Sequence, residues 1–139
     1  SSDLEDIPIP EKFDDSALIK IMQTGICGSD LQFHRKNKKE KKLLPGGHEV
    51  AGEIVEITPG EHNLSVGDRV AIEGIGAGRA CLKCFYCNNA RPSLCESYTD
   101  FIWNGYLMDG TTRMSINGKP LYHYCALSCL SEYAVVPEG

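Results

Sequence analysis

The chain has 139 residues, a formal net charge of −5, 42% hydrophobic residues and 24% charged residues. This length suits one folded domain, and the composition excludes a generally disordered chain. No apolar run approaches the roughly 18 residues of a membrane span, and the acidic balance disfavours a nucleic-acid surface, so we expect neither partner. Seven cysteines without an export signal favour metal binding over a disulfide framework, and a cytoplasmic location.

Short apolar segments bounded by turn residues predict a mostly β domain. The expected strands lie at residues 17–22, 50–57, 64–72 (a turn leading into a strand) and 130–137. Residues 27–33 predict one helical turn, and the basic run from Arg35 to Lys42 predicts a solvated loop. Residues 74–112 show no period, so something other than a hydrophobic core is expected to fix this lobe. The pattern therefore predicts a small barrel with one irregular lobe and no long helix.

Four cysteines within fifteen residues form a C-x2-C-x2-C-x7-C pattern, made by Cys81, Cys84, Cys87 and Cys95. Cysteines three apart can turn their sulfurs toward one point, and four thiolates complete the tetrahedral coordination of Zn²⁺. Because four protein ligands leave no position for water or substrate, such a site is structural. Two disulfides or four unlinked thiols are the alternatives. We predict a structural zinc that fixes the lobe at about residues 79–112.

Cys27 and His48 lie in two further motifs, GICGSD at residues 25–30 and GGHEVAG at residues 46–52. The simpler interpretation is a buried thiol and a hydrogen-bonded imidazole. The other is a catalytic zinc, which takes about three protein ligands and keeps one position open. Asp30 and Glu49 could then support the histidine, and Ser29 could place a hydroxyl near the open position as a proton carrier. The residues alone leave both interpretations open.

These motifs resemble those of the N-terminal GroES-like catalytic domain of zinc-dependent medium-chain alcohol and polyol dehydrogenases. The matching segments follow the family's order and cover nearly the whole chain: GICGSD, GGHEVAGEIVEI, VGDRVAIE, the four-cysteine lobe and SEYAVVP. Residues 107–133 resemble the return from the lobe to the barrel in alcohol and glutathione-linked formaldehyde dehydrogenases. The resemblance implies that residues 1–139 form a mostly β, partly open GroES-like barrel with an irregular zinc-binding lobe.

The resemblance also implies a role for each site residue. Cys27 and His48 would hold a catalytic zinc, and Ser29 would relay the substrate proton. Asp30 and Glu49 would lie behind that zinc, and the four cysteines of the lobe would hold the structural one. The zinc of this family lowers the pKa of a bound alcohol or polyol, which then passes hydride to NAD or NADP and leaves as the aldehyde or ketone.

The chain departs from the family pattern at several positions. Gln32 stands where many members have a relay histidine, and an amide cannot take up and release a proton. Thr58 stands where Gly or Ala is usual. The basic run from Arg35 to Lys42 is unusually charged for the segment before the zinc histidine. Besides a solvated loop, it could form a rim beside the cleft that attracts anions. Cys125 and Cys129 are left over; we expect small buried apolar residues, with a further metal site or redox pair as the alternative.

Several parts of the implied enzyme are expected outside this chain. These are the third catalytic-zinc ligand, the family's opening strand and the Rossmann cofactor domain, through which a homo-oligomer could form. We therefore expect a piece of a longer enzyme that is inactive alone. The alternative function is a non-catalytic, zinc-stabilised GroES-like module that binds a partner.

Overall fold

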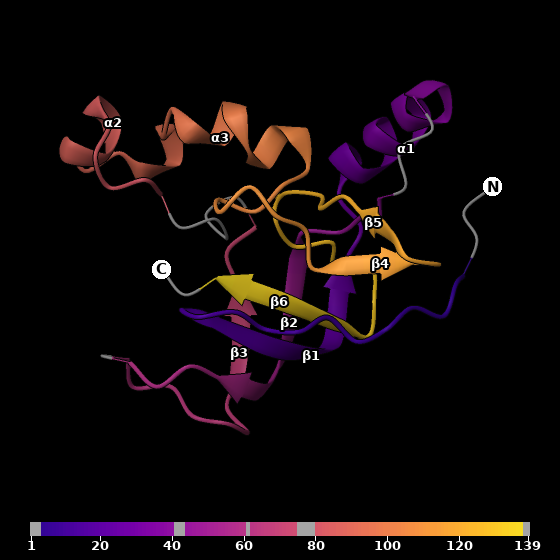
Figure 1. The fold of residues 1–139 in the computed structure, drawn as a ribbon, viewed down its shortest axis with the longest axis horizontal. Helices are drawn as coiled ribbons and strands as arrows, with labels where there is room; N and C mark the ends of the chain where they lie inside the picture. Colours follow the sequence, from indigo (N-terminus) through magenta and orange to yellow (C-terminus); the bar gives the residue numbers. More distant parts are fainter. Residues whose placement is uncertain (1–3, 41–43, 61, 75–79, 138–139) are drawn as a thin grey trace.

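The computed structural model describes residues 4–40, 44–60, 62–74 and 80–137, and a four-stranded antiparallel sheet is its central feature (Figure 1). The strand order is β3-β2-β1-β6, with strands at Ser16–Gly25 (β1), Glu49–Ile57 (β2), Arg69–Ile72 (β3) and Tyr133–Pro137 (β6). Within the described residues β3 and β6 are edge strands, so the sheet does not close on itself. The four predicted strands are confirmed, although β6 begins three residues later than predicted.

The core of the sheet lies along β1, because this strand is paired on both sides. Ile19 of β1 lies opposite Ile54 of β2 and Ala134 of β6, and none of the three is more than 1% exposed. Leu127 and Cys129, from the segment before β6, pack into the same cluster. Burying a large apolar side chain such as Ile19 contributes about 1.5–3 kcal/mol. The sheet therefore provides a firm base for the loops at its ends.

Helix α1 (Gly28–Glu40) is longer than the sequence indicated. The predictions of a single helical turn, of a loop from Arg35 to Lys42, and of no long helix are wrong. Arg, Lys, Gln and Glu are all good helix formers, so the run can continue the helix despite its like charges; Lys41 and Lys42 lie outside the described residues. None of the helices that the structure describes is long and apolar enough to cross a bilayer.

The lobe is a series of short helical segments beside the sheet (Figure 1). They are α2 (Phe85–Asn88), η1 (Pro92–Leu94), α3 (Ser97–Asp100) and η2 (Ile102–Asn104). The expectation that this region has no hydrophobic core is wrong, because Tyr98, Ile102 and Leu107 are at most 4% exposed and pack with Cys95. The sequence shows no regular spacing of apolar residues here because turns separate the residues that form this core.

A β-hairpin that the sequence analysis missed follows the lobe. Strands β4 (Met114–Ile116) and β5 (Lys119–Leu121) pair with Ile116 opposite Lys119, so the loop has two residues. These are Asn117 and Gly118, with φ of 49° and 72°. Asn-Gly is the strongest short-range hairpin signal in a sequence because both positions need positive φ. The hairpin was therefore detectable in the sequence.

Thr58 ties the end of β2 to the start of β1. Its hydroxyl donates to the Ser16 carbonyl oxygen at 3.2 Å and accepts from the Lys12 ammonium at 3.1 Å. The Ser16 side chain is fully buried, so this joint lies at the edge of the core. The Thr58 hydroxyl thus makes hydrogen bonds that Gly or Ala, the residues expected here from the family resemblance, could not make.

Candidate metal centres

The four cysteines of the lobe converge on one point. Their sulfur atoms all lie within 4.8 Å of one another. Cys84 Sγ lies 3.5 Å from Cys87 Sγ, which lies 3.9 Å from Cys81 Sγ. Sulfurs at the corners of a tetrahedron with Zn–S bonds of about 2.3 Å are separated by about 3.8 Å. The spacing of the donor atoms therefore fits a tetrahedral zinc.

The backbone around this cluster affects its thiols differently. The Lys83 amide lowers the pKa of Cys81 to about 6, and the Cys87 amide lowers the pKa of Cys84. Burial raises the pKa of Cys87 to about 12. Sulfurs this close together repel one another when ionised, and a cation removes that penalty. The cluster is thus chemically suited to a positive ion as well as geometrically.

A second cluster forms where β1, α1 and β2 meet. One donor atom from each of Cys27, His48 and Glu49 lies within 4.8 Å of the others. Cys27 directly precedes α1, His48 directly precedes β2, and Glu49 is the first residue of β2. His48 is 9% exposed, and Glu49 is exposed to solvent. The structure therefore brings a sulfur, an imidazole and a carboxylate to one place, which is a donor set that zinc accepts.

Asp30 joins the two segments that supply this cluster. Its Oδ2 accepts the Cys27 backbone N–H at 2.8 Å, and its Oδ1 accepts the Gly47 backbone N–H at 3.0 Å. Oδ1 also lies 3.5 Å from His48 Nδ1, a buried nitrogen with no hydrogen-bond partner among the described residues. The carboxylate is thus placed to orient the imidazole while it fixes the backbone beside both donors.

Two glycines leave the space that the cluster occupies. A Cβ at Gly25 would lie 2.5 Å from Glu49 Oε2, and a Cβ at Gly74 would lie 2.6 Å from the His48 carbonyl oxygen. Gly47, with φ of 90°, turns the chain into His48 and takes a conformation that residues with a Cβ rarely adopt. Local sterics therefore explain why glycine occupies these three positions.

The remaining predicted site residues lie along the first turns of α1. Ser29 is half-buried, whereas Gln32 is exposed. Sequence reasoning missed Tyr124, which lies 76 residues after His48 and 95 residues after Ser29 in the chain. Its ring packs edge-on to His48, with ring centroids 5.4 Å apart, and its phenol hydrogen-bonds to the Ser29 hydroxyl. No local motif indicates this contact, because it depends on the path of the chain from β5 to β6.

Cys125 and Cys129 belong to neither donor cluster in the described part of the chain. Burial raises the pKa of Cys125 to about 11 and also raises that of Cys129, so both are protonated thiols at neutral pH. Cys129 is fully buried and packs in the core of the sheet. The expectation of a small buried residue is thus confirmed for Cys129, whereas Cys125 is only half-buried.

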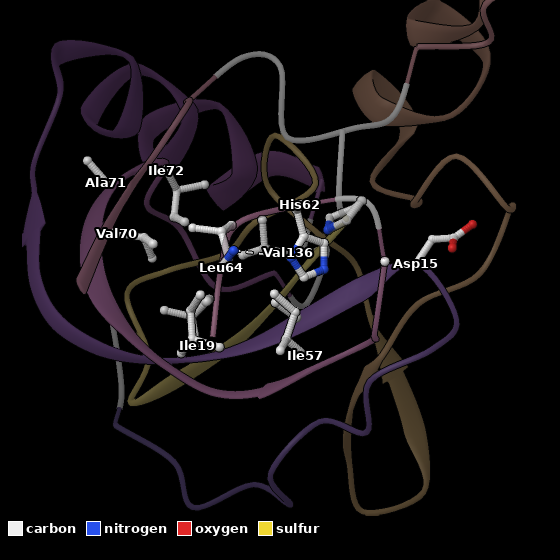
Figure 2. A pocket seen from close by; sticks show the side chains of 13 residues that line it. Asp15, Ile19, Ile57, His62, Leu64, Val70, Ala71, Ile72 and Val136 are labelled. Carbon is white, nitrogen blue, oxygen red and sulfur yellow. Dashed lines mark hydrogen bonds between the residues drawn. The ribbon is translucent and has the colours of Figure 1, made fainter. Parts of the chain in front are cut away.

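An apolar cavity of about 680 Å³ lies on the sheet (Figure 2). Side chains of the four strands and the β2–β3 connection line it, among them Ile57, Leu64, Val70 and Ile72. Its histidine, His62, has both ring nitrogens engaged, with Nε2 bonded to the Thr58 carbonyl and Nδ1 accepting the Leu64 N–H. None of the six clustered cysteine and histidine residues lines this cavity, so it is separate from the metal centres.

The alcohol dehydrogenase GroES-like domain model matches residues 14–139. S-(hydroxymethyl)glutathione dehydrogenases of Escherichia coli O1:K1 and Shigella sonnei are each 36% identical over 135 residues, which cover 96% of this chain and 35% of theirs. This chain thus spans about a third of the length of these curated relatives.

Solved structures are also similar. An alcohol dehydrogenase zinc-binding domain protein from Burkholderia ambifaria superposes with a TM-score of 0.70 at 27% identity, over 95% of this chain and 35% of that one. Benzyl alcohol dehydrogenase from Acinetobacter calcoaceticus gives a TM-score of 0.72 at 25% identity, over 94% and 34%. The predicted mostly β, GroES-like fold class is therefore confirmed.

Proposed function

This chain belongs to the alcohol dehydrogenase GroES-like domain family, and from that membership we propose that it is the catalytic domain of a zinc-dependent oxidoreductase. The reaction is hydride transfer between an alcohol or polyol and NAD or NADP. The observation that carries the proposal is the convergence of Cys27, His48 and Glu49 beside Ser29. The Rossmann cofactor domain is part of the proposal, because the chain spans only 35% of its relatives.

Two zinc ions fit the residues present. The four lobe cysteines would hold one, and their sulfur separations support tetrahedral coordination. Cys27 and His48 would hold the other. Because His48 Nδ1 faces the Asp30 carboxylate, Nε2 is the nitrogen left for the metal. Glu49 has a carboxylate oxygen within 4.8 Å of the donor atoms of Cys27 and His48, so it offers a third donor within this chain.

The residues around the second cluster would divide the work of alcohol oxidation. When bound there, zinc supplies Lewis-acid chemistry that lowers the pKa of an alcohol. The Ser29 hydroxyl would accept the alcohol proton and pass its own proton onward. Gln32 cannot take up a proton, so the path from Ser29 would lead to another hydroxyl or to water. Asp30 would hold the imidazole in one orientation, and the nicotinamide would carry the hydride.

The substrates of the similar proteins indicate the chemical class of the substrate. Those named above act on S-(hydroxymethyl)glutathione and on benzyl alcohol, so we propose a small primary alcohol or its aldehyde. A cytoplasmic location belongs to the same proposal, because thiolate ligands need a reducing compartment. A homo-oligomer formed through the cofactor domain is likewise proposed.

Spectroscopic assay of the natural full-length protein tests this function. The purified, zinc-loaded protein is offered NAD⁺ or NADP⁺ with benzyl alcohol, S-(hydroxymethyl)glutathione or a polyol, and reduced nicotinamide is followed by absorbance. We expect turnover with at least one pair and its loss in Cys27→Ser. A folded, two-zinc protein that reduces neither cofactor with any of these alcohols would instead support a non-catalytic binding module.

A further inference from the structure

Tyr124 covers one side of the second metal cluster. Its ring lies edge-on to the His48 imidazole at 70°, with ring centroids 5.4 Å apart. On its other side it packs on Phe33 of α1, with centroids 4.8 Å apart. Aromatic pairs favour such tilted and edge-on arrangements over face-to-face stacking. The two contacts hold the phenol ring between α1 and the start of β2.

The phenol hydroxyl of Tyr124 reaches the Ser29 hydroxyl. Burial raises the pKa of Tyr124, and the hydrogen bond with Ser29 opposes that effect. Ser29 lies one turn before Gln32 on α1, and Gln32 is exposed. The hydroxyl that would carry the substrate proton is therefore held from across the fold rather than by the next turn of its own helix.

The backbone that presents Tyr124 adopts an unfavourable conformation. Cys125, Ala126 and Ser128 all have positive φ, between 52° and 62°, although each carries a Cβ. Such conformations persist only where the surroundings hold them. Here the Tyr124 N–H donates to Ser128 Oγ at 2.8 Å, and the Cys129 N–H donates to the carbonyl oxygen of Gly47, the residue before His48. The segment is thus fastened to the metal cluster that Tyr124 covers.

We propose that Tyr124 is a positioning residue, whose phenol hydroxyl holds the Ser29 hydroxyl in one orientation and whose ring packs against His48. This inference rests on the proposed function, in which Ser29 accepts the proton of the alcohol. A serine hydroxyl rotates freely unless a partner fixes it. Holding it in one orientation reduces the reorganisation needed when the proton moves.

Steady-state kinetics of the full-length enzyme test the role. Tyr124→Phe keeps the ring on His48 and Phe33 but removes the hydroxyl, so we expect kcat to fall about tenfold while KM stays within about twofold. In Ser29→Ala we expect kcat to fall by about a hundredfold. In the Ser29→Ala background, Tyr124→Phe should have no further effect. The matched control is Tyr122→Phe, which makes the same change in a ring that packs on Tyr106.

A crystal structure of each variant supplies a readout that does not depend on turnover. We expect one Ser29 rotamer in the natural protein and two or more in Tyr124→Phe. An unchanged Ser29 rotamer, or independent kinetic effects of the two substitutions, would overturn the role of Tyr124. An unmodified enzyme that oxidises no alcohol would overturn the proposed function, whereas an active enzyme insensitive to Tyr124→Phe would overturn this inference alone.

Discussion

Asp30 Oδ1 lies 3.5 Å from His48 Nδ1, and both side chains are almost completely buried. The same carboxylate accepts backbone N–H groups from Cys27 and from Gly47. One side chain on the first turn of α1 therefore sets the relative position of two donors that are twenty-one residues apart. Its effect on the cluster should be larger than that of an ordinary surface carboxylate.

Replacing Asp30 with Asn should weaken the site and the fold together. The amide keeps one accepting oxygen but places an NH₂ group against a backbone N–H, so we expect a loss of about 1–3 kcal/mol in the free energy of unfolding. The affinity of the second cluster for zinc should fall about 10- to 100-fold, because a histidine loses the partner that orients it. Competition with a chromogenic chelator measures the affinity, and urea unfolding measures the stability.

Asp100→Asn is the matched control, because Asp100 is exposed at the end of α3. It should change neither quantity. Equal effects of the two substitutions would show that Asp30 has no special role in the site.

The two metal clusters should respond differently to loss of one cysteine. Cys84→Ser removes one of the four thiols proposed to hold the structural zinc, so we expect loss of one zinc, unfolding of the lobe and destabilisation by about 3 kcal/mol or more. Cys27→Ser should also lose one zinc and remove activity, but it should change the free energy of unfolding by less than about 1 kcal/mol. Elemental mass spectrometry after dialysis counts the zinc, and circular dichroism follows the fold. Equal loss of structure in both variants would contradict this division.

Much of the sheet was predictable because its signals are local. β1 and β2 are short, mostly apolar segments that end at turns, whereas the pairing of Ile19 with Ile54 is known only from the structure. The extent of α1 was misjudged because like charges were weighed above helix propensity. Propensity and charge repulsion compete in such a run, and the sequence alone does not say which is stronger.

The candidate sites divide in the same way. The four lobe cysteines are close in sequence, so their spacing already indicates that their sulfurs can meet. Cys27 and His48 needed a family resemblance to be considered together, and their roles stay predictions. Tyr124 left no sign, because its contact with Ser29 depends on a segment whose backbone is held in positive φ by long-range hydrogen bonds.

His123 should make the protein less stable in mild acid. Burial lowers its pKa from 6.5 to about 4, and Nε2 accepts the backbone N–H of Arg113 at 3.0 Å, so the folded protein holds the neutral form. In the unfolded chain the imidazole has a pKa near 6.5 and therefore binds a proton more readily than the buried imidazole does. The contribution of neutral His123 to the free energy of unfolding is fully present above about pH 6.5 and is lost as the pH falls toward 4. The loss reaches about 3 kcal/mol.

Urea unfolding across this pH range, in the natural protein and in His123→Gln, checks the effect. The amide oxygen of Gln can accept the Arg113 N–H but does not titrate, so the variant should lack this part of the pH dependence. Because both proteins share every other titrating group, the difference between their profiles isolates His123. Parallel profiles would show that His123 is not the source.

Thr58 should stabilise the joint between β2 and β1 through its hydroxyl. Thr58→Val keeps the shape of the side chain but removes the bonds to the Ser16 carbonyl oxygen and the Lys12 ammonium, so we expect a loss of about 1 kcal/mol. Thr58→Ser keeps the hydroxyl and should lose less. The free energy of unfolding in urea distinguishes the two variants. If Val were as stable as Thr, packing of the methyl group rather than hydrogen bonding would be what Thr58 contributes at this position.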